Sequence, residues 1–501
     1  MRISDKEMLS MTDLPFDKVS PYRVKVVEYT IPTTKEKRME ILKKYGYSGR
    51  LLPAEYVHIN MVTDSGTAAM SDRQWSAMML GDESYFEARS YENFEEAVNL
   101  FTDMPYILPC HQGRSGEYLV YQALVQQGDK VPSNTHFTTT GAWCYERGAE
   151  PVNLLCKDYL DSEDKGWFKG NMDIEAFEAY FIENAEKIPL VELVLPNNLN
   201  GGQPVSMANL KAVREIINKY DKRGTKLYLD VARISENAWM IKQHESGYED
   251  KSCLEIVREC MSYADGCHMS SKKAALVNMG GFVALRDKRT WQKMQPKLIR
   301  TDGYITYGGL TGRDLEAVAV GLIEGVNDYY LADRQRQVDY FAEACKKRGV
   351  HIMEPASCFA VYIDAGKCLP HLSPMEGPAT CLSAQAYLEG GFASTAMDSL
   401  QRAREDSSDP LNEGKKMTAP YELIRCAIPR RVYQEPHYDW AAECLARAMS
   451  HGTKLPAFRK IKEDRPPLEI SEIGLRTFFD NFEPVSDLPL GDPVKMVSTR
   501  I

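Results

Sequence analysis

Several features that would indicate other classes of protein are missing from this 501-residue chain. No apolar stretch approaches the roughly 18 residues that a membrane helix needs, and the N-terminus lacks the apolar core of a signal peptide. The twelve cysteines form no CxxC pair and the nine histidines no HxxxH pair, so we expect neither a disulfide framework nor a structural metal site. The net charge of −10 argues against a general affinity for nucleic acid or anionic membranes. These absences predict a cytoplasmic protein with reduced thiols.

The length and the patterning predict an α/β protein with more than one domain. Apolar residues make up 44% of the chain and charged residues 26%, which is the usual balance of a globular protein. Between about residues 64 and 325, short apolar runs such as 226–229 and 281–285 alternate with amphipathic stretches such as Met207–Tyr220. This alternation favours a mostly parallel central sheet covered on both faces. We predict a large domain (63–325) and a small α+β domain (326–501). The N-terminal segment (1–62) is expected to be part of the small domain.

The segment 263–273 ends in two lysines whose surroundings are unusual. A lysine is ordinarily a solvated surface group. Lys272 and Lys273 instead follow small and hydroxyl residues and precede the apolar run 274–277. Partial desolvation lowers the pKa of a lysine and makes its amine nucleophilic towards an aldehyde.

An acid, Asp230, ends the apolar run 226–230. Such an acid either caps a helix or, in an enzyme that uses pyridoxal 5′-phosphate (PLP), keeps the pyridine nitrogen protonated. Arg233, three residues later, is either a surface group or a partner for the phenolic oxygen of the cofactor.

A phosphate group would fit the segment 111–116, His-Gln-Gly-Arg-Ser-Gly, which precedes a predicted helix. Glycines at a helix start leave backbone N–H groups free, and Arg114 adds a positive charge. Many such turns bind nothing, so this motif is weak by itself. Residues 137–140, Phe-Thr-Thr-Thr, are expected to end a strand, and Phe137 would stack on a cofactor ring or fill the core.

Together these pieces resemble the tryptophanase/tyrosine phenol-lyase family of PLP-dependent β-eliminating lyases, which have the aspartate-aminotransferase (type I PLP-dependent transferase) fold. The resemblance runs from about Tyr22 to Phe482, nearly the whole chain. The stretches that carry it are Met61–Thr67, Met78–Glu83, His111–Arg114, Phe137–Thr140, Asn200–Met207, Tyr263–Gly266, Tyr307–Gly309 and Ile428–Tyr433.

The resemblance implies a role for each matching residue. Lys273 would be the Schiff-base lysine, with Lys272 beside it, and Tyr85 would help to protonate the leaving group. The implied cofactor contacts are Gln112, Gly113, Arg114, Phe137, Asn198, Asp230, Arg233 and Ser270. Asn198 and Arg425 would bind the α-carboxylate of the substrate or the O3′ side of the cofactor, with Thr63 close by. Gly66, Glu83 and Asn278 match the potassium site of the family. A homotetramer with active sites at a dimer interface is implied as well.

The residues expected to line the side-chain pocket depart from the family pattern. Phenol-lyases carry an arginine where this chain has Met397, and Thr477 replaces an aromatic residue or a histidine. Arg50 replaces a phenylalanine and Tyr304 a methionine, whereas Thr138 follows the phenol-lyase pattern. Arg50 either enters the pocket, which would favour a polar or anionic leaving group, or points to solvent.

The resulting expectation is a lyase that converts a β-substituted L-amino acid into pyruvate and ammonia. A transferase, by β-replacement or transamination, would use the same lysine and remains the alternative. A non-catalytic tetramer that merely keeps the fold is a third. The sequence does not identify the leaving group.

Overall fold

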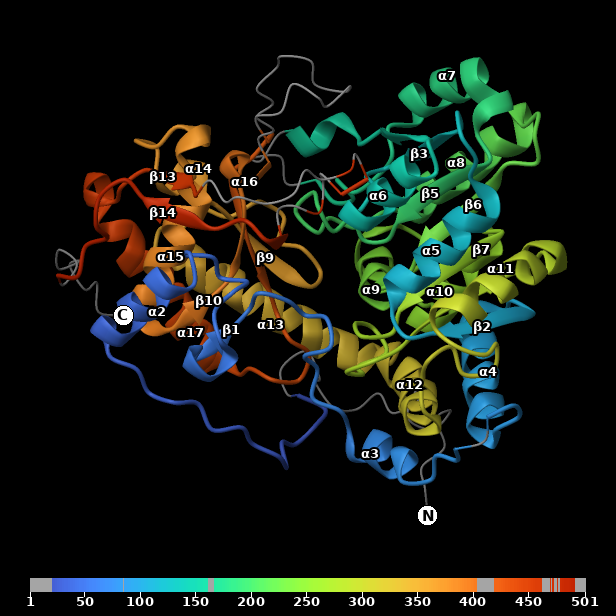
Figure 1. Cartoon of the computed structure of the whole chain (residues 1–501), viewed down its shortest axis with the longest axis horizontal. Coiled ribbons are helices and arrows are strands. Elements are labelled where there is room, and N and C mark those ends of the chain that lie inside the picture. The colour runs from blue at the N-terminus through green and yellow to red at the C-terminus, as the bar shows by residue number, and fades with distance from the viewer. Residues whose placement is uncertain are drawn as a thin grey trace. The chain divides into compact units, whose positions relative to one another are not determined.

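Two compact units make up the described part of the chain, and each is assembled from segments distant in sequence (Figure 1). The structure is a computed structural model that describes residues 20–83, 85–160, 166–402, 419–461, 469, 471–472, 475 and 478–491. Within those ranges, unit 1 comprises residues 20–22, 65–336 and 430–432, and unit 2 comprises 23–64, 337–429 and 433–491. The units change at residues 64 and 336, where the sequence placed the boundaries at 62 and 325.

A seven-stranded sheet forms the centre of unit 1, in the order β2-β8-β7-β6-β5-β3-β4. All its neighbouring pairs are parallel except those of β8, which is antiparallel to both β2 and β7, so the sheet is mostly parallel as predicted. The strands are β2 (Tyr106–Cys110), β3 (Lys130–Ser133), β4 (Glu150–Asn153), β5 (Leu190–Val194), β6 (Lys226–Asp230), β7 (Gly266–Ser270) and β8 (Gly281–Leu285).

Helices cover both faces of this sheet because alternate residues of its buried strands are apolar on each side. On one face, a large core joins Leu193, Leu229 and Met269 to α4 (Arg89–Thr102), α7 (Ile174–Asn184), α8 (Met207–Tyr220), α9 (Ile234–His244), α10 (Cys253–Ser262) and α12 (Gly312–Gly325). On the other face, a smaller core joins Leu190, Tyr228 and Val283 to α5 (Gly113–Leu124), α6 (Thr138–Glu146) and α11 (Lys288–Thr301). α3 (Asp72–Met78) precedes these helices in unit 1.

Local signals explain several helix boundaries. Ser206 caps α8, whose bounds are those predicted from the sequence, and Ser252 forms a capping box with Glu255 at the start of α10. α13 (Asp328–Lys347) follows α12 after a short break in the helix at residues 326–327. Phe137–Thr140 was wrongly predicted to end a strand: β3 stops at Ser133 and Phe137 is the N-cap of α6. The β-branched threonines favour a strand locally, but the packing of α6 on α5 decides their conformation.

Unit 2 is the smaller α+β unit. Its three-stranded sheet has the order β11-β12-β9, with β11 (Thr395–Met397), β12 (Leu423–Ala427) and β9 (Ala360–Asp364) antiparallel. Two short pairs accompany it, β1 (Ile59–Asn60) with β10 (Phe392–Ala393) and β13 (Phe458–Lys460) with β14 (Phe482–Pro484). Its helices are α2 (Lys35–Lys44), α14 (Ala365–Cys368), α15 (Pro378–Gly390), α16 (Ser399–Arg402) and α17 (Glu435–Ser450), and it holds the C-terminal part of α13.

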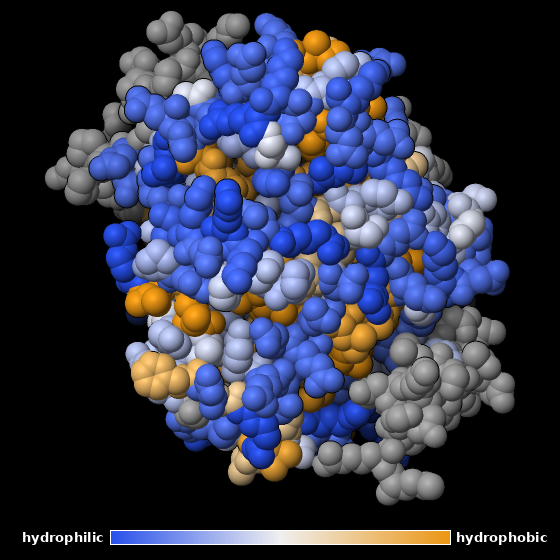
Figure 2. All heavy atoms as spheres, turned by 90° about the vertical axis from the view of Figure 1, so that its right-hand side faces the viewer, coloured by the Kyte–Doolittle hydropathy of each residue, from blue (hydrophilic) through white to orange (hydrophobic). Residues whose placement is uncertain are grey.

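The side of the molecule near α11 is mostly hydrophilic, and its hydrophobic side chains gather in separate small areas (Figure 2). Among the described helices, none combines the length and the apolar character that crossing a membrane requires.

Candidate active site

The residues expected to bind the cofactor meet at one edge of the seven-stranded sheet. Asp230 ends β6 and Ser270 ends β7, and these two strands run parallel. Asn198 lies in the loop that follows β5, the next strand along, and Arg233 is the N-cap of α9 directly after β6. The carboxyl ends of parallel strands are where α/β sheets bind their ligands.

The two lysines lie in the loop that follows β7 and are half-buried. Backbone hydrogen bonds fix this loop: Lys273 N donates to Ser270 O at 3.3 Å, and Ala274 N donates to Ala232 O at 3.1 Å. Burial lowers the pKa of Lys272, and the positive charge of Arg114 lowers it further. The loop therefore presents amines beside the ends of β6 and β7.

The N-terminus of α5 approaches the end of β7 closely. A Cβ atom at Gly113 would lie 2.6 Å from Cβ of Ser270, so only glycine allows this approach. No side chain caps the helix, and Arg114 in its first turn is exposed. Free backbone N–H groups, the Ser270 hydroxyl and the Arg114 guanidinium together form a donor set suited to a phosphate.

Asp230 lies beside a cluster of ionisable residues that the sequence analysis missed. Its carboxylate accepts a hydrogen bond from Ala232 N at 3.0 Å. One side-chain atom each of Glu117, Asp230 and His268 lie within 4.8 Å of one another. His268 also contacts Glu192, at 2.7 Å between side-chain atoms. Glu192 is the signal that could have revealed the cluster, because it is a charged residue inside the otherwise apolar β5, Leu-Val-Glu-Leu-Val.

Phe137, the expected stacking residue, is half-buried at the start of α6, which packs against α5. In the same turn, the Thr139 hydroxyl donates a hydrogen bond to the carboxylate of Glu117. Thr138, the first residue of α6, is also half-buried.

Four of the expected substrate residues lie in unit 2. Arg425 pairs with Thr395 across the β11–β12 ladder, and its Nη2 donates to the carbonyl of Val62, next to Thr63, at 3.3 Å. Met397, two residues beyond Thr395, lies on the same face of the sheet as Thr395 and is buried. The sheet thus holds the predicted carboxylate-binding arginine and the altered pocket residue on one face.

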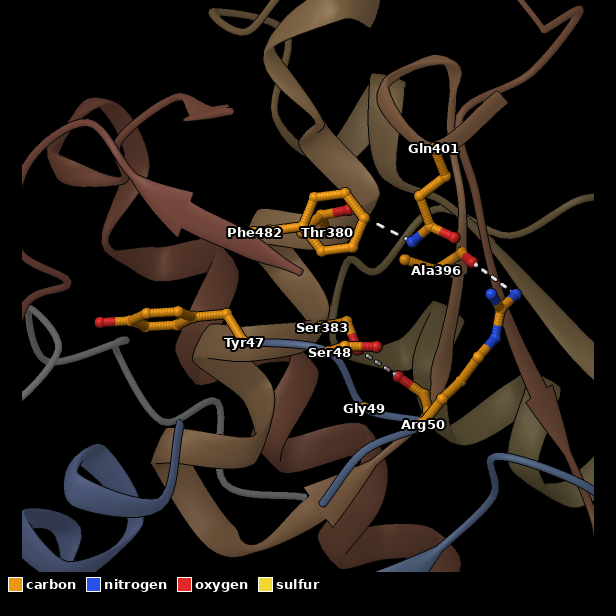
Figure 3. A pocket seen from close by; sticks show the side chains of 10 residues that line it. Tyr47, Ser48, Gly49, Arg50, Thr380, Ser383, Ala396, Gln401 and Phe482 are labelled. Carbon is orange, nitrogen blue, oxygen red and sulfur yellow. Dashed lines mark hydrogen bonds between the residues drawn. The ribbon is translucent and has the colours of Figure 1, made fainter. Parts of the chain in front are cut away.

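Arg50 is held against this sheet and does not simply extend into solvent. Its Nη2 donates to the carbonyl of Ala396, the neighbour of Met397, at 3.5 Å (Figure 3). The guanidinium carbon lies 5.4 Å from the centre of the Phe478 ring. Arg50 also lines a small cavity of about 10 Å³ together with Thr380 and Gln401, which is room for one water molecule. Thr477 lies outside the described residues.

Tyr85 and Tyr304 lie together in unit 1. Their rings stack at 6.1 Å between centres, and Tyr307 lies 5.2 Å from Tyr85. The hydrogen bond to Tyr307 raises the pKa of Tyr85, whose side chain is 59% exposed.

Two of the three expected potassium ligands are in contact. Asn278 Nδ2 donates to the carbonyl of Gly66 at 3.0 Å, and Gly66 N donates to Lys272 O at 2.8 Å. Glu83 pairs instead with Arg313, at 3.2 Å between side-chain atoms.

Comparisons with known proteins agree with this arrangement. The model of a family described as beta-eliminating lyase matches residues 60–444. The chain is 40% identical to a tyrosine phenol-lyase of Symbiobacterium thermophilum over 467 residues, covering 93% of this chain and 98% of the relative. It is 41% identical to a tryptophanase of Salinibacter ruber over 458 residues, covering 91% and 95% of the two chains.

Among solved structures, YbdL from Escherichia coli, a methionine aminotransferase, superimposes with a TM-score of 0.55 at 14% identity, covering 83% of this chain and 100% of that one. A serine palmitoyltransferase from S. paucimobilis superimposes with a TM-score of 0.51 at 12% identity, covering 78% and 86%. At such identities the likeness shows the fold alone, and that fold is the type I PLP-dependent transferase fold.

Proposed function

The chain belongs to the beta-eliminating lyase family and is a PLP-dependent lyase, and from this premise we propose that it converts a β-substituted L-amino acid into pyruvate and ammonia. The observation that carries the proposal is the close approach of Gly113 to Ser270. Asp230 ends the strand that pairs with the strand of Ser270, and Lys273 follows Ser270 by three residues. Phosphate donors, an acid and a lysine are thereby gathered at one sheet edge, which fits PLP.

When bound there, PLP supplies an electron-withdrawing ring that stabilises negative charge at the substrate Cα. Gly113, Arg114 and Ser270 would hold the phosphate, and Asp230 would keep the ring nitrogen protonated. Lys273 would attach the cofactor and remove the proton from the substrate Cα. Lys273 is half-buried in the loop that follows β7, beside the ends of β6 and β7.

The remaining roles concern the substrate. Arg425, near Thr63, would bind the α-carboxylate together with Asn198, and Tyr85 would donate a proton to the departing β-substituent. Tyr304 stacks on the ring of Tyr85 and Tyr307 meets it edge-on, and these contacts restrain the direction of the ring, which supports this assignment.

The side-chain pocket supports a leaving group that is neither phenol nor indole. A site built to hydrogen-bond a substrate group strongly rejects substrates that cannot complete those bonds. Met397 offers no donor where phenol-lyases carry an arginine, and Arg50 brings a cation to the neighbouring Ala396. We therefore propose a polar or anionic β-substituent.

We also propose that the enzyme is a cytoplasmic homotetramer that uses potassium. The side chains of Met79, Leu80, Tyr85 and Phe86 are apolar and exposed. They support a subunit contact near Tyr85, because such patches commonly mark subunit contacts.

Pyruvate release from a panel of L-amino acids tests the proposal: tyrosine, tryptophan, and cysteine or serine derivatives with small polar or anionic β-substituents. We expect pyruvate without any second substrate and the highest kcat/KM for the polar derivatives. A requirement for a second substrate would favour a transferase. If tyrosine or tryptophan were the best substrate by tenfold or more, the pocket assignment would fail while the cofactor assignment survived.

A further inference from the structure

A set of ionisable side chains lies beneath the cofactor residues, on the face of the sheet that α5 covers. Asp230 pairs with Val194 on one side and with His268 on the other, and Glu192 lies two residues before Val194. Because strand side chains alternate between faces, Glu192, Asp230 and His268 point to the same face. This face is otherwise apolar, with Leu190, Val131 and Val283 in its core.

Glu192 is the deepest member of the set and is fully buried. One of its carboxylate oxygens lies 2.7 Å from Nε2 of His268, and the other accepts a hydrogen bond from the Tyr121 hydroxyl at 2.9 Å. His136 Nδ1 lies 3.6 Å from the same carboxylate. Two histidines and a tyrosine therefore hold Glu192, and Glu192 in turn fixes the His268 ring.

His268 connects this buried carboxylate to the predicted cofactor partner. Its side chain is 1% exposed, and one of its ring nitrogens lies within 4.8 Å of carboxylate oxygens of both Asp230 and Glu117. Burial alone would lower the pKa of His268, but the hydrogen bond that its ring donates to Glu192 and the charge of Asp230 raise it to about 9. Burial raises the pKa of Glu117 to about 7, and the charge of Asp230 contributes.

Such a cluster is a costly way to stabilise a fold. Replacing buried ion pairs by apolar residues of similar volume is often neutral or stabilising, and ionisable groups with shifted pKa values concentrate at functional sites. The carboxylates of Glu117 and Asp230 would repel each other at this distance, and a positive charge on His268 beside both offsets that repulsion.

We propose that His268, held by Glu192, is a positioning residue that orients the Asp230 carboxylate towards the ring nitrogen of the cofactor. The inference rests on the role of Asp230 in the proposed function. Without the positive charge of His268, the neighbouring carboxylates of Asp230 and Glu117 would repel each other, and Asp230 would hold the ring less tightly.

The test measures the ring nitrogen directly. Holoenzyme is prepared with ¹⁵N-labelled PLP, the ring-nitrogen resonance is recorded by solid-state NMR, and cofactor affinity is measured by titration of the apoenzyme. We expect His268→Gln to move the resonance from its wild-type position and to raise the Kd for PLP about tenfold, the loss expected for one charged hydrogen bond. Glu192→Gln should produce the same changes, and the double variant should add little to either.

A matched control comes from unit 2, where His451 Nε2 lies 3.0 Å from the buried Glu389. His451→Gln removes the same kind of pair and should leave the resonance and the Kd unchanged. The proposal is overturned if folded His268→Gln and Glu192→Gln, verified by melting curves, both keep the wild-type resonance and a Kd within twofold. If Asp230→Asn itself leaves the resonance unmoved, the assignment of Asp230 fails and the inference fails with it.

Discussion

Each unit contains a buried histidine–glutamate pair, and the two pairs differ in what lies beyond them. In unit 2, Glu389 also accepts hydrogen bonds from Lys35 at 2.9 Å and Gln385 at 2.7 Å, so the pair joins α2, α15 and the end of α17. In unit 1, the pair of Glu192 and His268 continues to Asp230 and Glu117 at the cofactor edge. A pair of the same residue types thus cross-links helices in unit 2 and approaches the predicted reaction centre in unit 1.

The comparison extends to the division of work between the units. Unit 1 carries the lysines, the phosphate donors and Asp230, which any substrate of a PLP lyase would need. Unit 2 carries Arg50 and Met397, which would distinguish one side chain from another. Changes to these unit 1 residues should therefore affect all substrates alike, and changes to Arg50 or Met397 should affect some substrates only.

The largest expected effect is that of Lys273→Ala in unit 1. We expect the visible absorbance of the holoenzyme to be lost and activity towards every substrate to fall at least about 10³-fold, since the amine proposed to attach the cofactor is also the proposed base. Lys272→Ala is the matched control and should keep the absorbance. Borohydride reduction followed by peptide mass mapping checks the site, and a cofactor adduct on another lysine would disprove the assignment.

Removing the glutamate of each pair sharpens the comparison. Glu192→Ala and Glu389→Ala each leave a buried histidine without its carboxylate, so both should lower the free energy of unfolding by about 3 kcal/mol. Only Glu192→Ala should also change the visible circular dichroism of bound PLP. Equal spectral changes in both variants would mean that the signal reports stability and not position.

A change in the unit 2 pocket should be smaller and selective. Arg50→Ala is expected to lower kcat/KM about tenfold for substrates with an anionic β-substituent, the loss of one charged hydrogen bond, without changing the absorbance of PLP. Arg459, an exposed residue of the same unit paired with Glu483 at 2.7 Å, provides the control Arg459→Ala. A uniform loss across all substrates would place Arg50 outside the pocket.

The proposed use of potassium predicts a change of a few fold in activity. Gly66 and Asn278 meet in unit 1, and oxygen ligands suit a hard ion. Exchanging sodium for potassium should raise activity, and Glu83→Ala should reduce that response. Activity that is indifferent to both changes would remove the potassium assignment.

The smallest effect concerns pH and again separates the two pairs. The pKa of His268 is raised to about 9 in the folded protein, from an ordinary value of 6.5. The protonated ring thus stabilises the fold fully below pH 6.5, and this stabilisation is lost as the pH rises through 9. The holoenzyme should lose a few degrees of melting temperature between pH 7 and pH 10, and His268→Gln should lose less. His451→Gln should retain the wild-type decrease.

The sequence alone determined the fold class and the family, because both depend on local signals. The apolar periods of β6, β8 and α8 are readable within a few residues, and the lysine pair lies in the short segment between β7 and β8. Local signals gave the wrong prediction for residues 137–140, because their β-branched side chains favour a strand while packing against α5 makes them helical.

Only the tertiary structure decided which side chains meet beneath the cofactor edge and in the pocket. Glu117, Glu192, Asp230 and His268 come from four separate elements, and the register of β5, β6 and β7 brings three of them to one face. Arg50 meets Ala396 across 346 residues of chain. Strand order and register depend on contacts between distant segments, which local periodicity does not encode.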